Sequence, residues 1–207
     1  MTGLRRFAAP PVPAKPEPER CGLCGETLTS GRHGHLVDVR NRSLVCACIA
    51  CALLFTRDGA AGGRYRTVPD RVLRDPSAPL TEAEWATLAI PVAIAFFFFN
   101  SSLDRIVASY PSPAGVTECE LDLDAWDQIA GTHPLLRALA PDTEAILVIR
   151  GETFLVPVDM CYALAGTLRL NWHGFDGGAE ARHALETFLA DLRQRSRDLE
   201  AVPRWQN

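Results

Sequence analysis

Five of the seven cysteines in this 207-residue chain lie between positions 21 and 51. They follow the pattern Cys21-x-x-Cys24, then 21 residues, then Cys46-x-Cys48-x-x-Cys51. Two C-x-x-C pairs can be chosen from it, Cys21 with Cys24 and Cys48 with Cys51. Zinc in structural sites prefers four ligands in a tetrahedron, and two such turns supply four thiolates at nearly the usual spacing. The pattern therefore predicts a closed metal site that contributes folding free energy rather than chemistry.

The fifth thiol leaves the ligand set open. Cys46 can replace Cys48 as an alternative ligand, since both lie near the end of one predicted strand; we interpret Cys46 as a buried thiol beside the site. His33 and His35 can also bind metal, but five thiols make them unnecessary. The metal is open as well, because iron in a rubredoxin-like site or an iron–sulfur cluster uses the same ligands. Zinc is the default interpretation.

The residues around the two pairs predict elements that can position them. Gly25 permits a tight turn after the first pair. His35–Val39 and Ser43–Cys46 alternate as strands, with Arg40-Asn41-Arg42 as the turn between them. After Cys48, the run Ile49–Phe55 favours a helix. A turn, a hairpin and a pair at a helix N-terminus resemble a treble-clef or zinc-ribbon module.

The rest of the chain predicts an α+β domain with a mixed or antiparallel sheet. Thr81 and Glu84 fit a capping box for a helix over 81–89. Strands are expected at 92–99, 105–110 and 117–124, with a second hairpin over 143–158 around Gly151. A helix over 159–165 and a strand over 167–173 follow, and the last helix, 178–197, carries the apolar stripe Ala181, Leu185, Phe188, Leu189 and Leu192.

The predicted organisation has five parts. They are a proline-rich disordered lead-in (1–19), a cysteine-rich zinc-binding module (20–57), a connector (58–80), the α+β domain (81–197) and a flexible tail (198–207). The chain starts without a continuous apolar signal segment, and the apolar run 88–99 is too short for a spanning helix. We therefore expect a cytoplasmic protein with no membrane span, in which cysteine pairs bind metal rather than form disulfides.

Charge and composition bound the function. Apolar residues make up 47% of the chain and the formal net charge is −4, so a packed core is expected and a generic polyanion binder is not. Residues 32–74 nevertheless carry eight arginines against three aspartates. Nucleic-acid binding is therefore an alternative, and its cations would be Arg32, Arg40, Arg42, Arg64 and Arg66.

No convergent catalytic motif is visible, which favours a non-enzymatic protein over an enzyme. The alternative is nucleophilic catalysis by Cys161, with His133, His173 or His183 as the base. A buried, inert thiol is the simpler interpretation of Cys161. An iron-containing electron-transfer protein that uses the cluster from Cys21 to Cys51 is a further alternative.

Several segments together carry a family resemblance: CGLCG, HLVDVRNRSLVCACIACALLFTR, GGRYRTVPD, FFFFNSSLDRIVASYPSPAG and WHGFDGG. Over about residues 1–197 the chain resembles an actinobacterial family of unknown function. Genes of that family tend to lie beside NiFe-hydrogenase clusters. The resemblance implies an accessory protein whose partner is a hydrogenase or a maturation factor, with metal ligands among Cys21, Cys24, Cys46, Cys48 and Cys51. It implies no catalytic residue.

Overall fold

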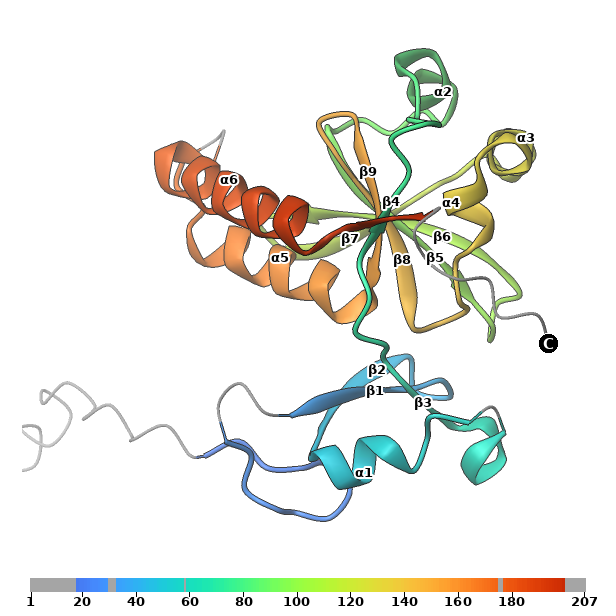
Figure 1. The fold of residues 1–207 in the computed structure, drawn as a ribbon. Helices are drawn as coiled ribbons and strands as arrows, with labels where there is room; N and C mark the ends of the chain where they lie inside the picture. The colour runs from blue at the N-terminus through green and yellow to red at the C-terminus, as the bar shows by residue number, and fades with distance from the viewer. Residues whose placement is uncertain (1–17, 30–32, 58, 175–176, 200–207) are drawn as a thin grey trace, which may run out of the picture.

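The structure is a computed structural model that describes residues 18–29, 33–57, 59–174 and 177–199. A three-stranded sheet near the N-terminus is followed by a seven-stranded sheet with helices on both faces (Figure 1). The predicted α+β class is confirmed, and the large sheet is mixed. Most of the predicted lead-in (1–19) and most of the predicted tail (198–207) lie outside the described residues.

The small sheet is antiparallel with the order β2-β1-β3. The elements of this part of the chain, in order, are β1 (Gly34–Asp38), β2 (Ser43–Ala47), helix α1 (Ile49–Leu53), the 3-10 turn η2 (Ala60–Gly63) and β3 (Tyr65–Thr67). The predicted hairpin is confirmed, and its register places His35 opposite Cys46. The buried carboxylate of Asp38 holds the turn, because it accepts hydrogen bonds from the backbone and side chain of Asn41 and from Arg64.

The segment predicted as a connector (58–80) contributes a strand to each sheet. β3 pairs with β1 of the small sheet, and β4 (Leu73–Arg74) pairs with β9 of the large one. Strands of two or three residues are too short to show an alternating pattern. Their pairing depends on partner strands far away in the sequence, so no local signal identifies them.

The large sheet has the order β10-β4-β9-β8-β5-β6-β7, and its neighbours are antiparallel except for β10 with β4. Its remaining strands are β5 (Ile94–Asn100), β6 (Arg105–Ser112), β7 (Gly115–Cys119), β8 (Glu144–Ile149), β9 (Glu152–Pro157) and β10 (Arg197–Asp198). The helices are α2 (Glu82–Thr87), α3 (Leu123–Thr132), α4 (Pro134–Arg137), α5 (Val158–Leu170) and α6 (Gly178–Arg195). Within the described ranges, none of the helices is long and apolar enough to cross a bilayer.

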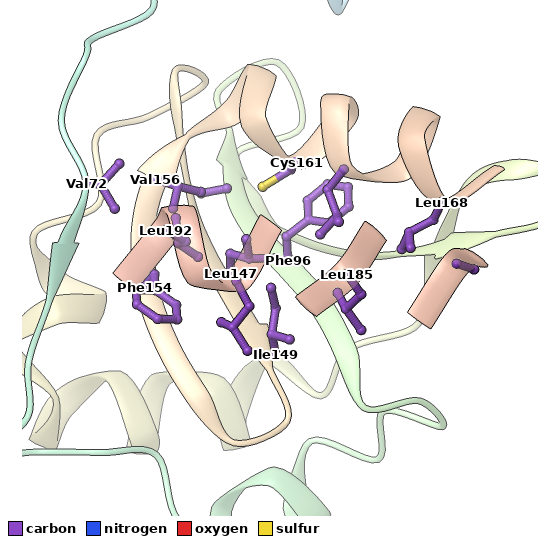
Figure 2. Packing of buried hydrophobic residues seen from close by; sticks show 14 residues of the cluster. Val72, Phe96, Leu147, Ile149, Phe154, Val156, Cys161, Leu168, Leu185 and Leu192 are labelled. Carbon is purple, nitrogen blue, oxygen red and sulfur yellow. The ribbon is translucent and has the colours of Figure 1, made fainter. Parts of the chain in front are cut away.

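The core is divided into two layers by the large sheet. Leu147 and Ile149 of β8 face α5 and α6, together with Phe96 of β5 (Figure 2). The alternate residues Ile146 and Val148 pack on the other side with residues of α3 and α4. Because successive side chains of a strand point to opposite faces, a strand buried on both faces is apolar except where a charged side chain is paired. This accounts for the apolar run Ala145–Ile149 in β8, whose first residue, Glu144, is buried in an ion pair with Arg71.

The seven-stranded sheet and the helices α2 to α6 are called the large domain below. Most of the elements predicted for it are confirmed, and one predicted strand is wrong. The chain over 167–173, predicted as a strand after a short helix, continues α5 to Leu170. Cys161, Leu164, Ala165 and Leu168 are buried at helical spacing on the face that meets the sheet. The alternation of TLRL fits a strand locally, but burial of this helical stripe decides the structure. The predicted strand over 117–124 is also shorter, because Asp122 caps α3.

Candidate metal centre

The first C-x-x-C pair lies in a tight turn held by backbone hydrogen bonds. The N–H of Gly25 donates to the carbonyl of Cys21 over 2.9 Å, and Gly25 has the left-handed φ of 77°. Gly22 donates its N–H to the carbonyl of Cys46 over 2.8 Å. A Cβ at Gly22 would lie 2.5 Å from a methyl of Val45, so only glycine allows this approach. The turn is therefore fixed against β2, next to the second pair.

The second pair lies at the N-terminus of α1. Cys48 is the N-cap residue, and its Sγ accepts a hydrogen bond from the backbone N–H of Cys51 over 3.5 Å. Cys51 lies in the first turn of the helix. The exposed N–H groups and the dipole of a helix N-terminus both favour thiolates. The second pair therefore lies at the end of β2, the strand to which the turn of Cys21 and Cys24 is hydrogen-bonded.

The four sulfurs of Cys21, Cys24, Cys48 and Cys51 lie within 4.8 Å of one another. The Sγ atoms of Cys24 and Cys48 are 3.8 Å apart. Sulfurs placed about 2.3 Å from a common zinc ion, at the corners of a tetrahedron, are separated by about 3.8 Å. The two pairs predicted from the sequence therefore come together in an arrangement that fits a tetrahedral four-thiolate metal centre.

The electrostatics of the four thiols also fit a bound cation. Burial raises the pKa of Cys21, but hydrogen bonds from the backbone of Cys24 and Cys48 outweigh it and bring that pKa to about 6. Contacts with the thiols of Cys48 and Cys24 raise the pKa of Cys51 to about 12. One thiolate thus forms easily, while full ionisation of the cluster is opposed by mutual repulsion. A divalent cation removes that repulsion and releases the remaining protons.

Small apolar side chains surround the centre. Leu28, Leu36, Ala47 and Ala52 form a buried cluster with Cys21. Such a core is far smaller than those above and below the large sheet, so a metal would supply much of the stability of this part of the chain. Four protein ligands leave no open coordination position for substrate. The arrangement is that of a structural site, and the same donors also accept iron.

Cys46 lies outside this group. Its sulfur clusters instead with ring nitrogens of His33 and His35, across the β1–β2 pair. The alternative in which Cys46 replaces Cys48 is therefore not the arrangement found here. The strand register distinguishes Cys46 from Cys48, because it places Cys46 opposite His35. The cysteine spacing does not show this register.

The two remaining cysteines lie in the large domain. Cys161 is fully buried against the sheet (Figure 2), and burial raises the pKa of its thiol well above the ordinary value. A nucleophilic cysteine needs the thiolate form, so this environment opposes catalysis by Cys161. Burial also raises the pKa of Cys119 in β7.

A cavity of about 590 Å³ separates part of the small sheet from the large domain. Its wall includes Val37, Val39 and Arg42 on one side and Phe98, Glu118 and Tyr162 on the other. Around it the two parts are joined by polar contacts, among them an ion pair of 3.0 Å between Arg42 and Glu118. No sequence motif indicates this cavity, because its wall is assembled from strands and helices that are distant in the sequence.

Comparison with known proteins gives a family and no closer relative. No curated protein and no solved structure matches the chain. The model of one protein family matches residues 20–196, which include both the cysteine centre and the large domain. By that match the chain belongs to the family of unknown function DUF5947.

Proposed function

We propose that this protein is a non-catalytic accessory protein, in which a zinc ion stabilises a small module that binds a protein partner. The centre suits a structural role, because its four thiolates leave no position for substrate. The observation that carries protein binding is the apolar surface beside it. Ile49, Leu53 and Leu54 are 55%, 64% and 68% exposed at and just beyond α1.

This surface lies on a helix whose other side is fixed by the metal centre and the small core. Cys48 and Cys51 hold the N-terminal end of α1 at the metal centre, and Ala52 packs its inner side on the small core. The outward side therefore presents aliphatic side chains on a support that the metal makes rigid. Clustered exposed apolar residues mark protein-binding sites more often than single ones do. A complementary apolar segment of another protein is the partner that this chemistry recognises.

The nature of the partner is proposed from the resemblance. Genes of the similar family tend to lie beside NiFe-hydrogenase clusters, so we propose a hydrogenase or one of its maturation factors. Nucleic acid is less favoured because three of the four candidate arginines within the described residues are paired in the protein, while Arg32 lies outside those residues. The pairs are Arg42 with Glu118, Arg64 with Asp38 and Arg66 with Asp142.

The first test is metal content. We expect purified protein to be colourless and to contain zinc, and a rubredoxin-like or iron–sulfur absorption spectrum would replace this proposal with the electron-transfer alternative. The second test is capture from the native host with full-length bait. We expect wild type to recover a hydrogenase or maturation component and Leu54→Glu to lose it.

The matched control is Leu170→Glu, since Leu170 is an 83% exposed leucine at the end of α5 in the large domain. It receives the same change in charge at a site remote from the metal centre in sequence. Equal capture by Leu54→Glu and wild type would reject α1 as the docking surface. Absence of any hydrogenase component from the wild-type capture would reject the proposed partner.

A further inference from the structure

A second group of metal-binding side chains lies on the β1–β2 hairpin. One ring nitrogen each of His33 and His35 and the sulfur of Cys46 lie within 4.8 Å of one another. His35 and Cys46 are direct partners in the antiparallel register, and the two imidazole rings meet edge to face at 4.9 Å. Imidazole and thiolate are the donors that zinc and its neighbours among the divalent metals prefer.

His35 is oriented as a metal-binding histidine is. Its Nδ1 lies 2.6 Å from a carboxylate oxygen of Asp159, which is 124 positions away at the start of α5. In the neutral tautomer, Nδ1–H donates to this carboxylate and Nε2 carries the free lone pair. A carboxylate on the second nitrogen fixes the ring and makes its lone pair a better ligand.

Two buried polar atoms at this place have no partner among the described residues. They are Nδ1 of His33 and the second carboxylate oxygen, Oδ1, of Asp159. Buried nitrogen and oxygen atoms nearly always bind a partner, so these two atoms are suited to face a cation. A cation near His33 and His35 would satisfy the imidazole and offset the carboxylate charge.

Charge balance also favours a divalent ion. Two neutral imidazoles and one thiolate leave a net charge of +1 on a bound divalent metal. The carboxylate of Glu19 lies close enough to act through its charge on both His35 and Cys46. Glu19 therefore supplies a negative charge beside the three donors.

We propose that His33, His35 and Cys46 bind a divalent transition-metal ion of the zinc class at a second site, distinct from the four-cysteine centre. Three protein ligands leave the fourth position open to water or an incoming ligand, in contrast to the closed centre. Because Asp159 belongs to the large domain, this site also links metal binding to the junction between the small sheet and α5.

The test is the cobalt stoichiometry of the full-length protein. We expect wild type to bind two Co²⁺ per chain, and Cys46→Ser and His33→Asn to bind one each. The single Co²⁺ ion that each of these two variants binds should show the absorption of a four-thiolate centre. Cys119→Ser is the matched control for loss of a partly buried thiol, and it should still bind two. Asp159→Asn should keep both sites but weaken the second about 10- to 100-fold.

The outcomes separate this site from the four-cysteine centre. One cobalt per wild-type chain would overturn the second site. So would loss of cobalt from Cys46→Ser but not from His33→Asn, because His33 lies just before β1 and its substitution spares the strand pairing.

Discussion

The guanidinium of Arg66 in β3 lies 3.0 Å from the carboxylate of Asp142, in the turn just before β8, and this ion pair joins the small sheet to the large one. The carboxylate is nearly buried and also accepts hydrogen bonds from the backbone N–H and the hydroxyl of Ser101, at 2.8 and 2.6 Å. Asp142 is therefore held by the large domain, and Arg66 binds to a preformed acceptor.

We expect Arg66→Met to lower the free energy of unfolding by about 2 kcal/mol, because it removes a charge-assisted hydrogen bond from a poorly solvated carboxylate. Denaturant titration measures this. Arg42→Met is the control, because the pair between Arg42 and Glu118 is exposed on both sides and should contribute at most about 1 kcal/mol. Equal losses in the two variants would mean that the Arg66 pair contributes no more than a surface contact.

A second ion pair fixes the segment between the sheets. Arg71 donates to both carboxylate oxygens of Glu144, at 2.5 and 2.7 Å, and the Glu144 side chain is completely buried. Among the described residues, Arg71→Met would leave this buried charge with the N–H of Ala140 as the one remaining donor to its side chain. We expect a loss of about 3 kcal/mol or more in the free energy of unfolding.

The matched control is Arg74→Met. Arg74 pairs with Asp198, whose side chain is half exposed, so the loss of this pair should lower the free energy of unfolding only slightly. Arg71→Met combined with Glu144→Met should recover much of the stability, since no unpaired charge remains. A double variant that is less stable than Arg71→Met would contradict this account of the pair.

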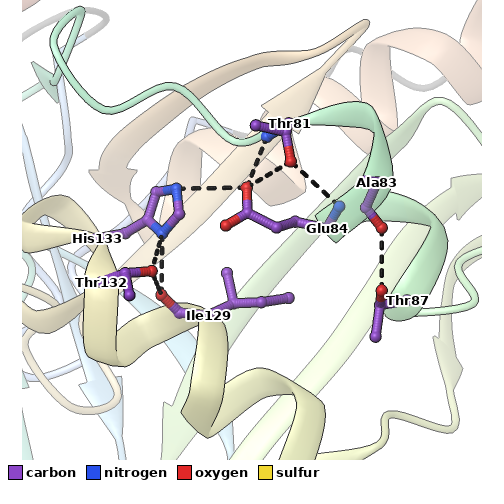
Figure 3. Close-up of polar contacts among 7 residues, drawn as sticks. All are labelled: Thr81, Ala83, Glu84, Thr87, Ile129, Thr132 and His133. Carbon is purple, nitrogen blue, oxygen red and sulfur yellow. Dashed lines mark hydrogen bonds and ion pairs between the residues drawn. The ribbon is translucent and has the colours of Figure 1, made fainter.

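Because of the capping box of α2, the free energy of unfolding should decrease at acid pH. Glu84 accepts hydrogen bonds from the backbone N–H and hydroxyl of Thr81, and its carboxylate lies 3.6 Å from Nε2 of His133 (Figure 3). The N–H of Thr81 lowers the pKa of Glu84, outweighing burial. A lowered pKa in the folded state gives stability above the ordinary glutamate pKa of about 4.3, and this stability is lost as the pH falls through the folded-state value.

Glu84→Gln should therefore cost about 1 kcal/mol near neutral pH, and the difference from wild type should shrink below about pH 4. Thermal unfolding between pH 3 and 7 measures it. Glu82→Gln changes an acid in the same first turn that no capping bond uses, so its effect should be a few tenths of a kcal/mol. If the stability difference between Glu84→Gln and wild type grew as the pH fell, the pKa of Glu84 would not be lowered by folding.

The sequence predicts best where a pattern is local and long. The hairpin of β8 and β9 follows from two apolar runs around Gly151, and the stripe in α6 defines its buried face. The approach of Cys21 and Cys24 to Cys48 and Cys51 follows from paired C-x-x-C turns. Each of these depends on residues within a short window, or on a chemistry that only a few arrangements satisfy.

Prediction fails where distant strands decide the structure. The short strands β3 and β4 exist only through their partners, and α5 replaces a locally plausible strand because the sheet buries its helical stripe. The contact between His35 and Asp159 spans 124 positions and has no sequence signature. For the same reason the approach of Cys46 to His33 and His35 is not visible in the cysteine spacing.

Removal of metal should unfold the small sheet before the large domain. The small core around Cys21 and Leu36 is slight, whereas β8 is buried on both faces. Binding of about 10–16 kcal/mol, typical of structural zinc sites, is then most of what stabilises the small part. After chelation, hydrogen exchange should become fast in β1, β2 and α1 while β8 stays protected. Cys51→Ala should reproduce this, and Cys119→Ala, a thiol in β7, should not. Simultaneous loss of protection in β8 would show that the contacts of Arg66 and His35 make the two parts one folding unit.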